Sequence, residues 1–436
     1  MRNLFTYFGF NKENVLNILF NLSKKTDYIS VLVSNYNKKT SGLPKDYVNY
    51  DIIAGIGCID FIQSNNNSFE KLNNFQLRKR DWLFGYLSYD LKNEIEELQS
   101  NNIDNFNAKN LFFFIPEYVI LLNDNKLEIK THNSKELCSQ FVKNFNDSDF
   151  PRINSKIHFK ARDDKKTYLK KIEKIKSHIQ KGDIYEMNYC QEFYSFGNII
   201  SPESVFLDLN EKMHTPFSSF LKLKETYVLS ASPERFLKKK SNCILSQPIK
   251  GTRKRGKTNL LDHNLINELK NSSKDISENV MIVDLVRNDL SVTAKKASVN
   301  VFELCEVYTF KEVHQMITSV VSEVDSCVKF SDILKGTFPM GSMTGVPKFR
   351  SMELIEYYEN FKRGIYSGSI GYITPELDFD FSVVIRTILY NLANQYVSIG
   401  VGGAITIQSD PNEEYEECFI KAKPLFEVLN FKINDL

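Results

Sequence analysis

One lysine stands between an isoleucine and a glycine in a basic loop. The stretch Pro248–Gly256 reads PIKGTRKRG, and its proline and glycines indicate the end of a strand that turns into a loop. With its stem against apolar neighbours, Lys250 would lose hydration, so we expect its pKa to fall and part of it to be the free amine. A free amine can act as a nucleophile. The alternative, from these residues alone, is a solvated lysine.

A pair of carboxylates lies at the start of a predicted helix that follows this loop. The helix covers residues 272–290, and Ser272 with Asp275 is a plausible capping pair. Asp275 and Glu278 are three residues apart, so both would reach one cation or one partner. The alternative is a capped, solvated helix start.

A second acidic face is predicted on the last helix of the chain. Asp410 as the N-cap and Pro411 at the first helical position begin this helix. Glu414, Glu417 and Lys421 then fall on one face, where they would form either surface pairs or a site. Carboxylates from two helices, completed by water, are suited to Mg²⁺, and the scattered histidines make no competing site for a softer metal.

Two predicted strands carry residues that suit an anionic small molecule. Arg386 lies within the apolar stretch 379–390, and an arginine there needs a carboxylate from the protein or from a substrate. The stretch 396–407 contains the adjacent glycines Gly402 and Gly403, which indicate the close approach of a ligand or of another backbone. The sequence contains no GxGxxG or Walker loop, so we expect no nucleotide.

The elements that must position these residues are mostly strands. Their residue types predict strands over 28–33, 52–62, 82–89, 111–122 and 127–131 in the first part of the chain. Apolar residues at helical spacing predict helices over 167–181, 260–269 and 349–358. The polar stretch 146–160 divides the chain into an N-terminal part, 1–150, and a second part, 151–436, which holds all the candidate residues.

The composition of the chain limits the classes of partner and the cellular location that we expect. The chain has 436 residues, is 42% hydrophobic and carries a net charge of +2, which gives no case for a nucleic-acid or membrane partner. Seven cysteines lie far apart without a CxxC pair, which indicates reduced thiols. No apolar run approaches the ~20 residues of a membrane span, and the N-terminal run is too short for a signal peptide. We therefore expect a cytoplasmic protein.

At this level of detail the chain resembles the chorismate-binding enzymes, which include the large subunits of anthranilate and aminodeoxychorismate synthases. The motifs that carry the resemblance are GDIYEMN (182–188), SPERF (232–236), PIKGTRKRG (248–256), ENVMIVDLVRNDL (278–290), FPMGSMTGVPK (338–348), RGIYSGSIGY (363–372), IRT (385–387) and SDPNEEYEECFIKA (409–422). The resemblance implies an α+β fold in which two large antiparallel β-sheets pack as a sandwich with helices outside. Both parts of the chain would contribute strands.

The resemblance also implies roles for single residues. Lys250 would attack C2 of chorismate while the C4 hydroxyl leaves, and Glu234 would protonate that hydroxyl, which requires a raised pKa. Glu278 and Glu417 match the Mg²⁺ ligands, with the metal-site residues Asp275 and Glu414 beside them. The substrate-binding positions would be Gly251, Thr252, Ser342, Tyr366, Arg386, Gly402, Gly403 and Lys421.

Within the family, the lysine of PIKGT resembles the aminodeoxychorismate synthases, whereas anthranilate synthases usually have PIAGT. The implied reaction adds ammonia at C4 and gives 4-amino-4-deoxychorismate, the precursor of 4-aminobenzoate and folate. The ammonia would come from a separate glutamine amidotransferase subunit (component II). The alternative enzyme is anthranilate synthase component I, in which Lys250 would be a bystander and pyruvate would leave.

Some positions depart from the family pattern. Glu186 occupies the place of a lysine that activates water in isochorismate and salicylate synthases, which argues against those activities. Gln315 stands where the family commonly has histidine, with His314 before it, and Ala404 replaces a glycine. A non-catalytic scaffold or nucleic-acid binder is a further alternative, but it has no use for the carboxylates of the two helices.

Overall fold

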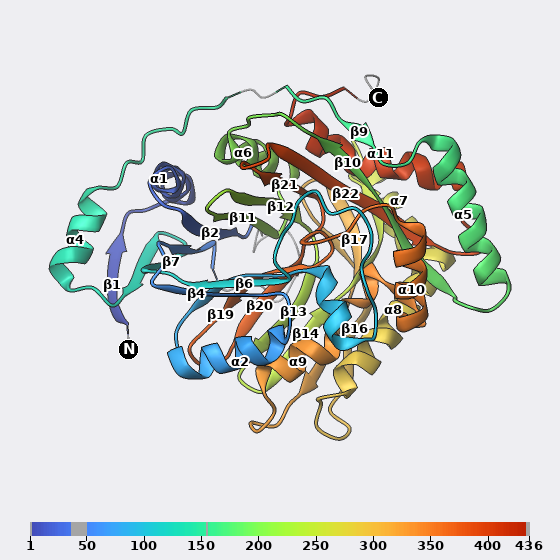
Figure 1. Ribbon diagram of the computed structural model, residues 1–436, viewed down its shortest axis with the longest axis horizontal. Helices are drawn as coiled ribbons and strands as arrows, with labels where there is room; N and C mark the ends of the chain where they lie inside the picture. Colours follow the sequence, from blue (N-terminus) through green and yellow to red (C-terminus); the bar gives the residue numbers. More distant parts are fainter. Residues whose placement is uncertain (1, 36–49, 154–155, 433–436) are drawn as a thin grey trace.

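A computed structural model describes residues 2–35, 50–153 and 156–432, and within these ranges the chain forms two large antiparallel β-sheets with helices on their outer faces (Figure 1). The α+β sandwich that the resemblance implies is confirmed. In the described part of the chain no helix combines the length and the apolar character needed to cross a membrane.

The first sheet has twelve strands in the described residues. In spatial order they are β1 (Asn3–Phe8), β8 (Lys126–Thr131), β7 (Tyr118–Asn123), β3 (Ile52–Ile56), β2 (Tyr28–Val33), β11 (Phe217–Leu223), β12 (Thr226–Ser232), β21 (Thr387–Asn391), β22 (Tyr396–Ile405), β10 (Glu186–Ser195) and β18 (Gly345–Val346), with β9 (Lys160–Ala161) also beside β10.

The second sheet has ten strands in the same part of the chain. Their order is β15 (Ile249–Lys254), β17 (Val313–Glu323), β14 (Cys243–Gln247), β13 (Arg235–Lys240), β20 (Phe379–Val383), β19 (Ser369–Ile373), β5 (Leu83–Leu87), β6 (Leu111–Ile115) and β4 (Asp60–Ser64), with β16 (Asn300–Thr309) on the other edge of β17.

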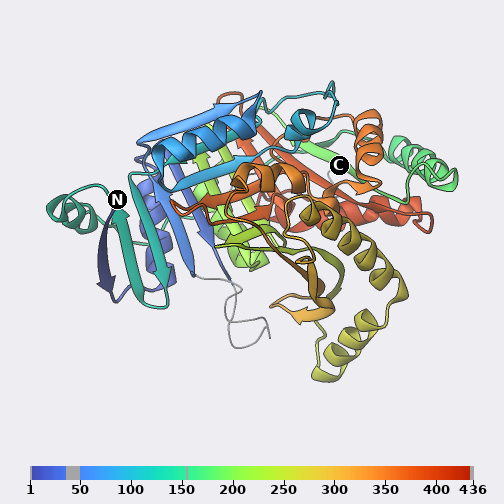
Figure 2. The same cartoon turned by 90° about the horizontal axis from the view of Figure 1, so that it is seen from below.

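Helices cover the outer face of each sheet (Figures 1 and 2). The first sheet packs against α1 (Lys12–Ser23), α5 (Lys165–Gln180), α6 (Pro202–Met213) and α11 (Pro411–Glu427), and α10 (Lys348–Tyr358) lies at its β10 edge. The second packs against α2 (Ser68–Lys79), α8 (Ser273–Ser291) and α9 (Phe330–Thr337). The remaining elements are α3 (Lys92–Ile95), α4 (Lys135–Lys143), α7 (Asn259–Lys270) and the 3₁₀ turns η1 (Tyr89–Leu91) and η2 (Gly341–Met343).

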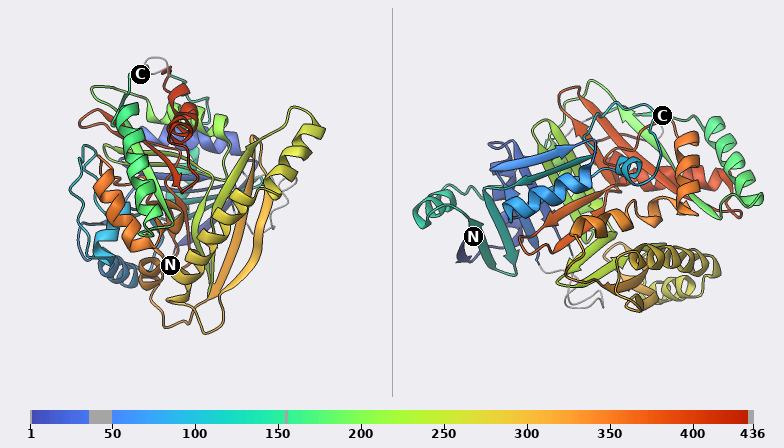
Figure 3. Two further views of the ribbon diagram at one scale, coloured as in Figure 1. Left: turned by 90° about the vertical axis from the view of Figure 1, so that its right-hand side faces the viewer. Right: turned by 60° about the horizontal axis from the view of Figure 1, so that its bottom comes forward.

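Two apolar cores hold these layers together. One lies between the first sheet and its helices and contains Phe20 of α1 and Phe426 of α11. The other contains residues of both sheets, among them Leu121 from the first and Phe113 from the second, together with Val283 of α8. Figure 3 shows that α7 and α8 with β16 and β17 form a lobe at one side of the sandwich. The second core contains residues of both sheets and of α8, so this lobe is packed directly on the sandwich.

Strands from the first 131 residues enter both sheets. Leu87 of β5 pairs with Ser369 of β19, and Val33 of β2 pairs with Ser218 of β11. The N-terminal stretch therefore belongs to the same two sheets as the rest of the chain.

Three predicted strands were wrong in the same way. Each of the stretches 52–62, 111–122 and 379–390 forms two strands, one in each sheet: β3 and β4, β6 and β7, β20 and β21. The chain crosses between the sheets at the midpoint of each stretch, and at two of these crossings Gly57 and Arg386 have positive φ. Because both halves are apolar, periodicity cannot reveal the crossing.

The predicted helix starts are confirmed. The Ser272 side chain accepts a hydrogen bond from the backbone N–H of Asp275, and Asp410 accepts from the N–H groups of Asn412 and Glu413. These caps satisfy donors that the first turn leaves free, so α8 and α11 each begin at a defined residue. Both helices carry candidate site residues in their first turns.

Candidate active site

Lys250 lies on β15 with its ammonium group inside the protein. Its Nζ donates a hydrogen bond to Oε1 of Glu186 on β10 at 2.9 Å, and the two side chains are 10% and 2% exposed. Burial lowers the pKa of Lys250, but the carboxylates of Glu186, Glu278 and Glu234 raise it, and the result is a pKa above the ordinary value. The prediction of a lowered pKa was wrong, because the local motif does not show that Glu186 contacts the amine.

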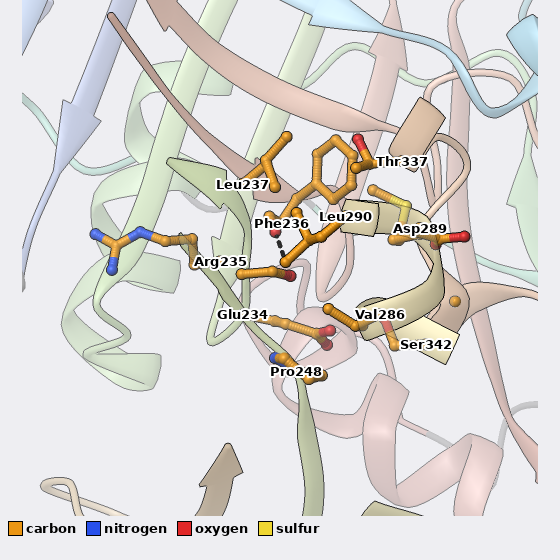
Figure 4. A pocket seen from close by; sticks show the side chains of 13 residues that line it. Glu234, Arg235, Phe236, Leu237, Pro248, Val286, Asp289, Leu290, Thr337 and Ser342 are labelled. Carbon is orange, nitrogen blue, oxygen red and sulfur yellow. Dashed lines mark hydrogen bonds between the residues drawn. The ribbon is translucent and has the colours of Figure 1, made fainter. Parts of the chain in front are cut away.

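Glu234 lies in the turn between β12 and β13 and lines a small pocket. Figure 4 shows its carboxyl group near Pro248, Val286 and Ser342, which line the same pocket. Burial raises the pKa of Glu234 to about 7, although the Ser342 hydroxyl and the Lys250 ammonium both act to lower it. The raised pKa that an acid at this position requires is therefore present.

A buried ion pair holds the loop that carries Ser342, and no sequence argument pointed to it. Arg363 Nη2 lies 2.6 Å from Glu359 Oε1, and both side chains are 1% exposed. Arg363 Nη1 donates to the backbone oxygen of Met343 at 2.7 Å, and its Nη2 donates to that of Asn188 at 2.9 Å. The Asn188 amide in turn donates to the Ser342 carbonyl at 2.8 Å. Glu359 and Arg363 are four residues apart but lie just after the end of α10, so helical spacing in the sequence would not have predicted this ion pair.

The predicted face of α11 lies against the glycines of β22. Lys421 Nζ lies 2.6 Å from Glu417 Oε1 and donates to the Gly402 carbonyl at 2.7 Å. A Cβ at Gly403 would lie 3.1 Å from Glu414 Oε2, so a side chain there would fill the space beside that carboxylate. The close approach that the two glycines indicated is therefore made by α11 at Gly403, whereas at Gly402 a Cβ would lie 2.2 Å from the Tyr189 carbonyl oxygen of β10.

The acidic starts of α8 and α11 face the same region. Burial raises the pKa of Glu278 and of Glu414, and the Lys274 ammonium opposes the rise in both. Burial also acts to raise the pKa of Glu417, but Lys421 and Lys274 hold it below its ordinary value. One ammonium group of α8 thus acts on carboxylates of both helices. Within the described ranges, however, no three His, Cys, Asp or Glu side chains are grouped closely enough to hold a metal ion.

Asp275 contacts the Lys250 loop. Its carboxylate forms an ion pair with Arg253 at 3.0 Å. Gly251 has a φ of +83°, and a Cβ there would lie 3.0 Å from Asp275 Oδ1, so a larger residue would be both strained and crowded. Asp275 therefore supports the backbone beside Lys250.

Arg386 and Tyr366 lie near the α11 face. Arg386 sits between β20 and β21 with a φ of +52° and donates to the Lys421 carbonyl at 3.0 Å. Burial lowers its pKa, and in the part of the chain that the structure describes it forms no ion pair. The ring of Tyr366 packs under Gly400, where a Cβ would lie 2.5 Å from it, and its hydroxyl donates to Cys190 Sγ at 3.6 Å. Arg386 is therefore a cation free to meet an anionic ligand.

The remaining predicted positions lie on the β15–β17 ladder. Thr252 is exposed and pairs with Gln315, whereas His314 faces the opposite side of β17 and is fully buried. The His314 ring contacts Thr309 and Asp262, each at 2.9 Å. His314 thus has a structural position and does not replace the histidine that the family has at Gln315.

Comparisons with known proteins identify the family of the chain. The family model described as "chorismate binding enzyme" matches residues 33–427. A probable chloroplastic aminodeoxychorismate synthase of Oryza sativa subsp. japonica is 39% identical over 272 residues, 62% of this chain but 30% of that protein. The aminodeoxychorismate synthase component 1 of Bacillus subtilis is 31% identical over 353 residues, 78% of this chain and 74% of that protein.

The fold has close counterparts among solved structures. Anthranilate synthase component I from Streptococcus pneumoniae superimposes with a TM-score of 0.77, covering 89% of this chain and 94% of that one at 22% identity. At this identity the likeness concerns the fold alone, whereas the family model spans nearly the whole chain. The chain belongs to the chorismate-binding enzyme family.

Proposed function

We propose that this chain is component I of an aminodeoxychorismate synthase, which converts chorismate and ammonia to 4-amino-4-deoxychorismate for the synthesis of 4-aminobenzoate and folate. The observation that carries the proposal is the buried amine of Lys250 close to Glu234, whose pKa is about 7. The two relatives named as aminodeoxychorismate synthases support this choice within the family.

The two groups suit a substitution that passes through a covalent intermediate. The Lys250 amine would attack C2 of chorismate, the ring double bond would shift, and the C4 hydroxyl would leave as water with a proton from Glu234. Ammonia would then add at C4 and expel the lysine. A pKa of about 7 leaves much of Glu234 protonated near neutral pH, which an acid in this step needs.

Two cationic side chains on or near α11, Arg386 and Lys421, would bind the carboxylates of chorismate. Arg386, which has no ion-pair partner in the described residues, is suited to one carboxylate, and Lys421 is nearby. Gly402 and Gly403 of β22, which β10 and α11 approach closely, are substrate positions on the family's pattern. The other positions assigned to substrate on the family's pattern are Gly251, Thr252, Ser342 and Tyr366.

Carboxylates of α8 and α11 are the proposed Mg²⁺ ligands, although in the described residues no three of them are grouped closely enough to hold the ion without water. Glu278 is half-buried and forms no hydrogen bond or ion pair within the part of the chain that the structure covers, so a cation beside it would be favourable. Together with Glu414 and Glu417 it offers the oxygen donors that Mg²⁺ takes alongside water. When bound, Mg²⁺ would neutralise negative charge on the substrate carboxylate. Asp275, paired with Arg253, would act only through the loop of Lys250.

Ammonia would come from a glutamine amidotransferase subunit in trans. The glutaminase Cys/His/Glu module is expected outside these 436 residues, in which none is recognisable. Free ammonium at high concentration should replace it in the assay.

The test is to identify the product. The purified chain is incubated with chorismate, Mg²⁺ and ammonium, and an added aminodeoxychorismate lyase converts the product to 4-aminobenzoate. Lys250→Ala should bind chorismate but form no product. Lys254→Ala, an exposed lysine on the same strand, should retain activity. Anthranilate fluorescence without added lyase would instead identify an anthranilate synthase and refute the proposal.

A further inference from the structure

We infer that Glu186 is the proton acceptor that converts Lys250 from an ammonium to a free amine at the start of the reaction and returns the proton at its end. The inference rests on the proposed function. Glu186 contacts the reacting nitrogen itself, because its Oε1 accepts the hydrogen bond of Lys250 Nζ at 2.9 Å. At that distance a proton moves along an existing hydrogen bond, and no rearrangement is needed.

The need for an acceptor follows from the charge around Lys250. The carboxylates that face the amine are Glu186 from β10, Glu234 from the β12–β13 turn and Glu278 from α8, and together they keep the amine protonated in the free protein. An ammonium ion has no lone pair with which to attack carbon. Glu234 must itself carry a proton for the leaving hydroxyl, and Glu278 makes no hydrogen bond to the amine in the described residues. Glu186 is the carboxylate that both contacts the amine and is free of another task.

In the part of the chain that the structure describes, only one oxygen of the Glu186 carboxylate is hydrogen-bonded, and its partner is Lys250. The second oxygen, Oε2, is buried and has no hydrogen-bond partner within the described residues. The carboxylate can therefore take the Lys250 proton without breaking a hydrogen bond to any other described residue.

The backbone of Glu186 is fixed on both sides. It pairs with Val346 of β18, and its carbonyl accepts a hydrogen bond from Ser351 Oγ of α10 at 3.3 Å. The carboxylate therefore meets the amine from a strand that the neighbouring elements hold in place. A fixed base of this kind loses little free energy to reorganisation during the reaction.

The proton and electron balance closes over one turnover. Glu186 takes a proton from Lys250, the nitrogen lone pair forms the N–C2 bond, the double bond shifts, and the C4–O bond breaks as Glu234 protonates the hydroxyl to water. Ammonia then forms the C4–N bond, and the C2–N bond breaks with its electron pair returning to Lys250. The new ammonium at C4 gives a proton to Glu234, and Glu186 returns its proton to Lys250.

The experiment measures the rate of the lysine adduct and of product in Glu186 variants of the full chain with chorismate, Mg²⁺ and ammonium. Glu186→Gln keeps the hydrogen bond to Lys250 but cannot take a proton. We expect the rate to fall by about 100-fold or more, within the usual range for general acid–base catalysis, while chorismate binding changes little. Glu186→Ala should be equally slow, and added formate should restore its rate in a concentration-dependent manner because formate supplies the missing carboxylate.

Glu192→Gln is the matched control. Glu192 is a buried glutamate of the same strand, and its carboxylate pairs with Arg162 at 2.8 Å, not with Lys250. This variant should form the adduct at the wild-type rate. A wild-type rate in Glu186→Gln, or a slow Glu186→Ala that formate does not restore, would overturn the inference. If the wild-type chain makes no 4-amino-4-deoxychorismate, the proposed function itself fails, so the two failures are distinct.

Discussion

Replacing Glu234 by glutamine should make the protein more stable at alkaline pH while it removes activity. Glutamine has nearly the same shape as glutamic acid and stays neutral at every pH. The native carboxyl group is buried, and that burial raises its pKa from 4.5 to about 7. The folded protein therefore disfavours the ionised form, and the variant removes the group that must ionise.

The magnitude and sign follow from proton binding. Between pH 4.5 and 7 the folded state holds a proton on Glu234 that the unfolded state has lost, so the free energy of unfolding falls as pH rises. The pKa of Glu234 rises from 4.5 to about 7 on folding, and each pKa unit corresponds to about 1.4 kcal/mol. Above pH 7 the free energy of unfolding is therefore lower by roughly 3 kcal/mol. Below pH 4.5 both states are protonated and the contribution vanishes. The variant should thus gain up to about 3 kcal/mol over wild type between pH 4.5 and pH 8.

Urea unfolding of wild type and Glu234→Gln at pH 4.5, 6 and 8 measures this difference. Glu416→Gln, which changes an exposed carboxylate, serves as the control and should follow the wild-type pH dependence. A difference between Glu234→Gln and wild type that stays constant across these pH values would show that Glu234 ionises freely in the folded protein. The reasoning that makes it a proton donor near neutral pH would then be refuted.

Three other changes test separate parts of the structure. Gly400→Ala places a Cβ 2.5 Å from the Tyr366 ring, so it should lower the free energy of unfolding in urea by about 1–3 kcal/mol. It should also raise KM for chorismate. A wild-type KM would show that Tyr366 does not bind substrate. Glu359→Gln leaves Arg363 charged and buried without its partner and should lower the free energy of unfolding by about 3–5 kcal/mol. A loss below about 1 kcal/mol would show that this ion pair does not hold the loop of Ser342. A chelator should abolish product formation until Mg²⁺ is added, and Glu278→Gln should raise the Mg²⁺ concentration needed; activity that persists in excess chelator would exclude the ion.

Local signals predicted the helices better than the strands. The caps at Ser272 and Asp410 depend on residues within one turn, so the sequence contains what is needed to place them. The sheets depend on pairings between distant segments, and three apolar stretches that read as single strands cross from one sheet to the other. Not every apolar residue of α8 is buried: Val280 is 44% exposed, because α8 packs on the second sheet through other positions, among them Ile282 and Val286.

The candidate site also depends on contacts between distant segments, which the sequence does not show. The motif around Lys250 identified a special lysine, but the sign of its pKa change depends on Glu186, which lies on the other sheet. The pair of Glu359 and Arg363 went unnoticed because neither residue touches the expected substrate. Sequence patterns thus proposed candidate side chains, whereas the contacts and charges around those side chains required the three-dimensional arrangement.

The pairing of β5 with β19 affects how the chain is made. Leu87 must remain without its final neighbour until the ribosome has delivered Ser369, so one edge of a hydrophobic strand waits through most of translation. Pairings this far apart along the chain slow folding, since a large loop must close before the contact forms. Nascent chains that stall before β19 should therefore be prone to aggregation and depend on chaperones.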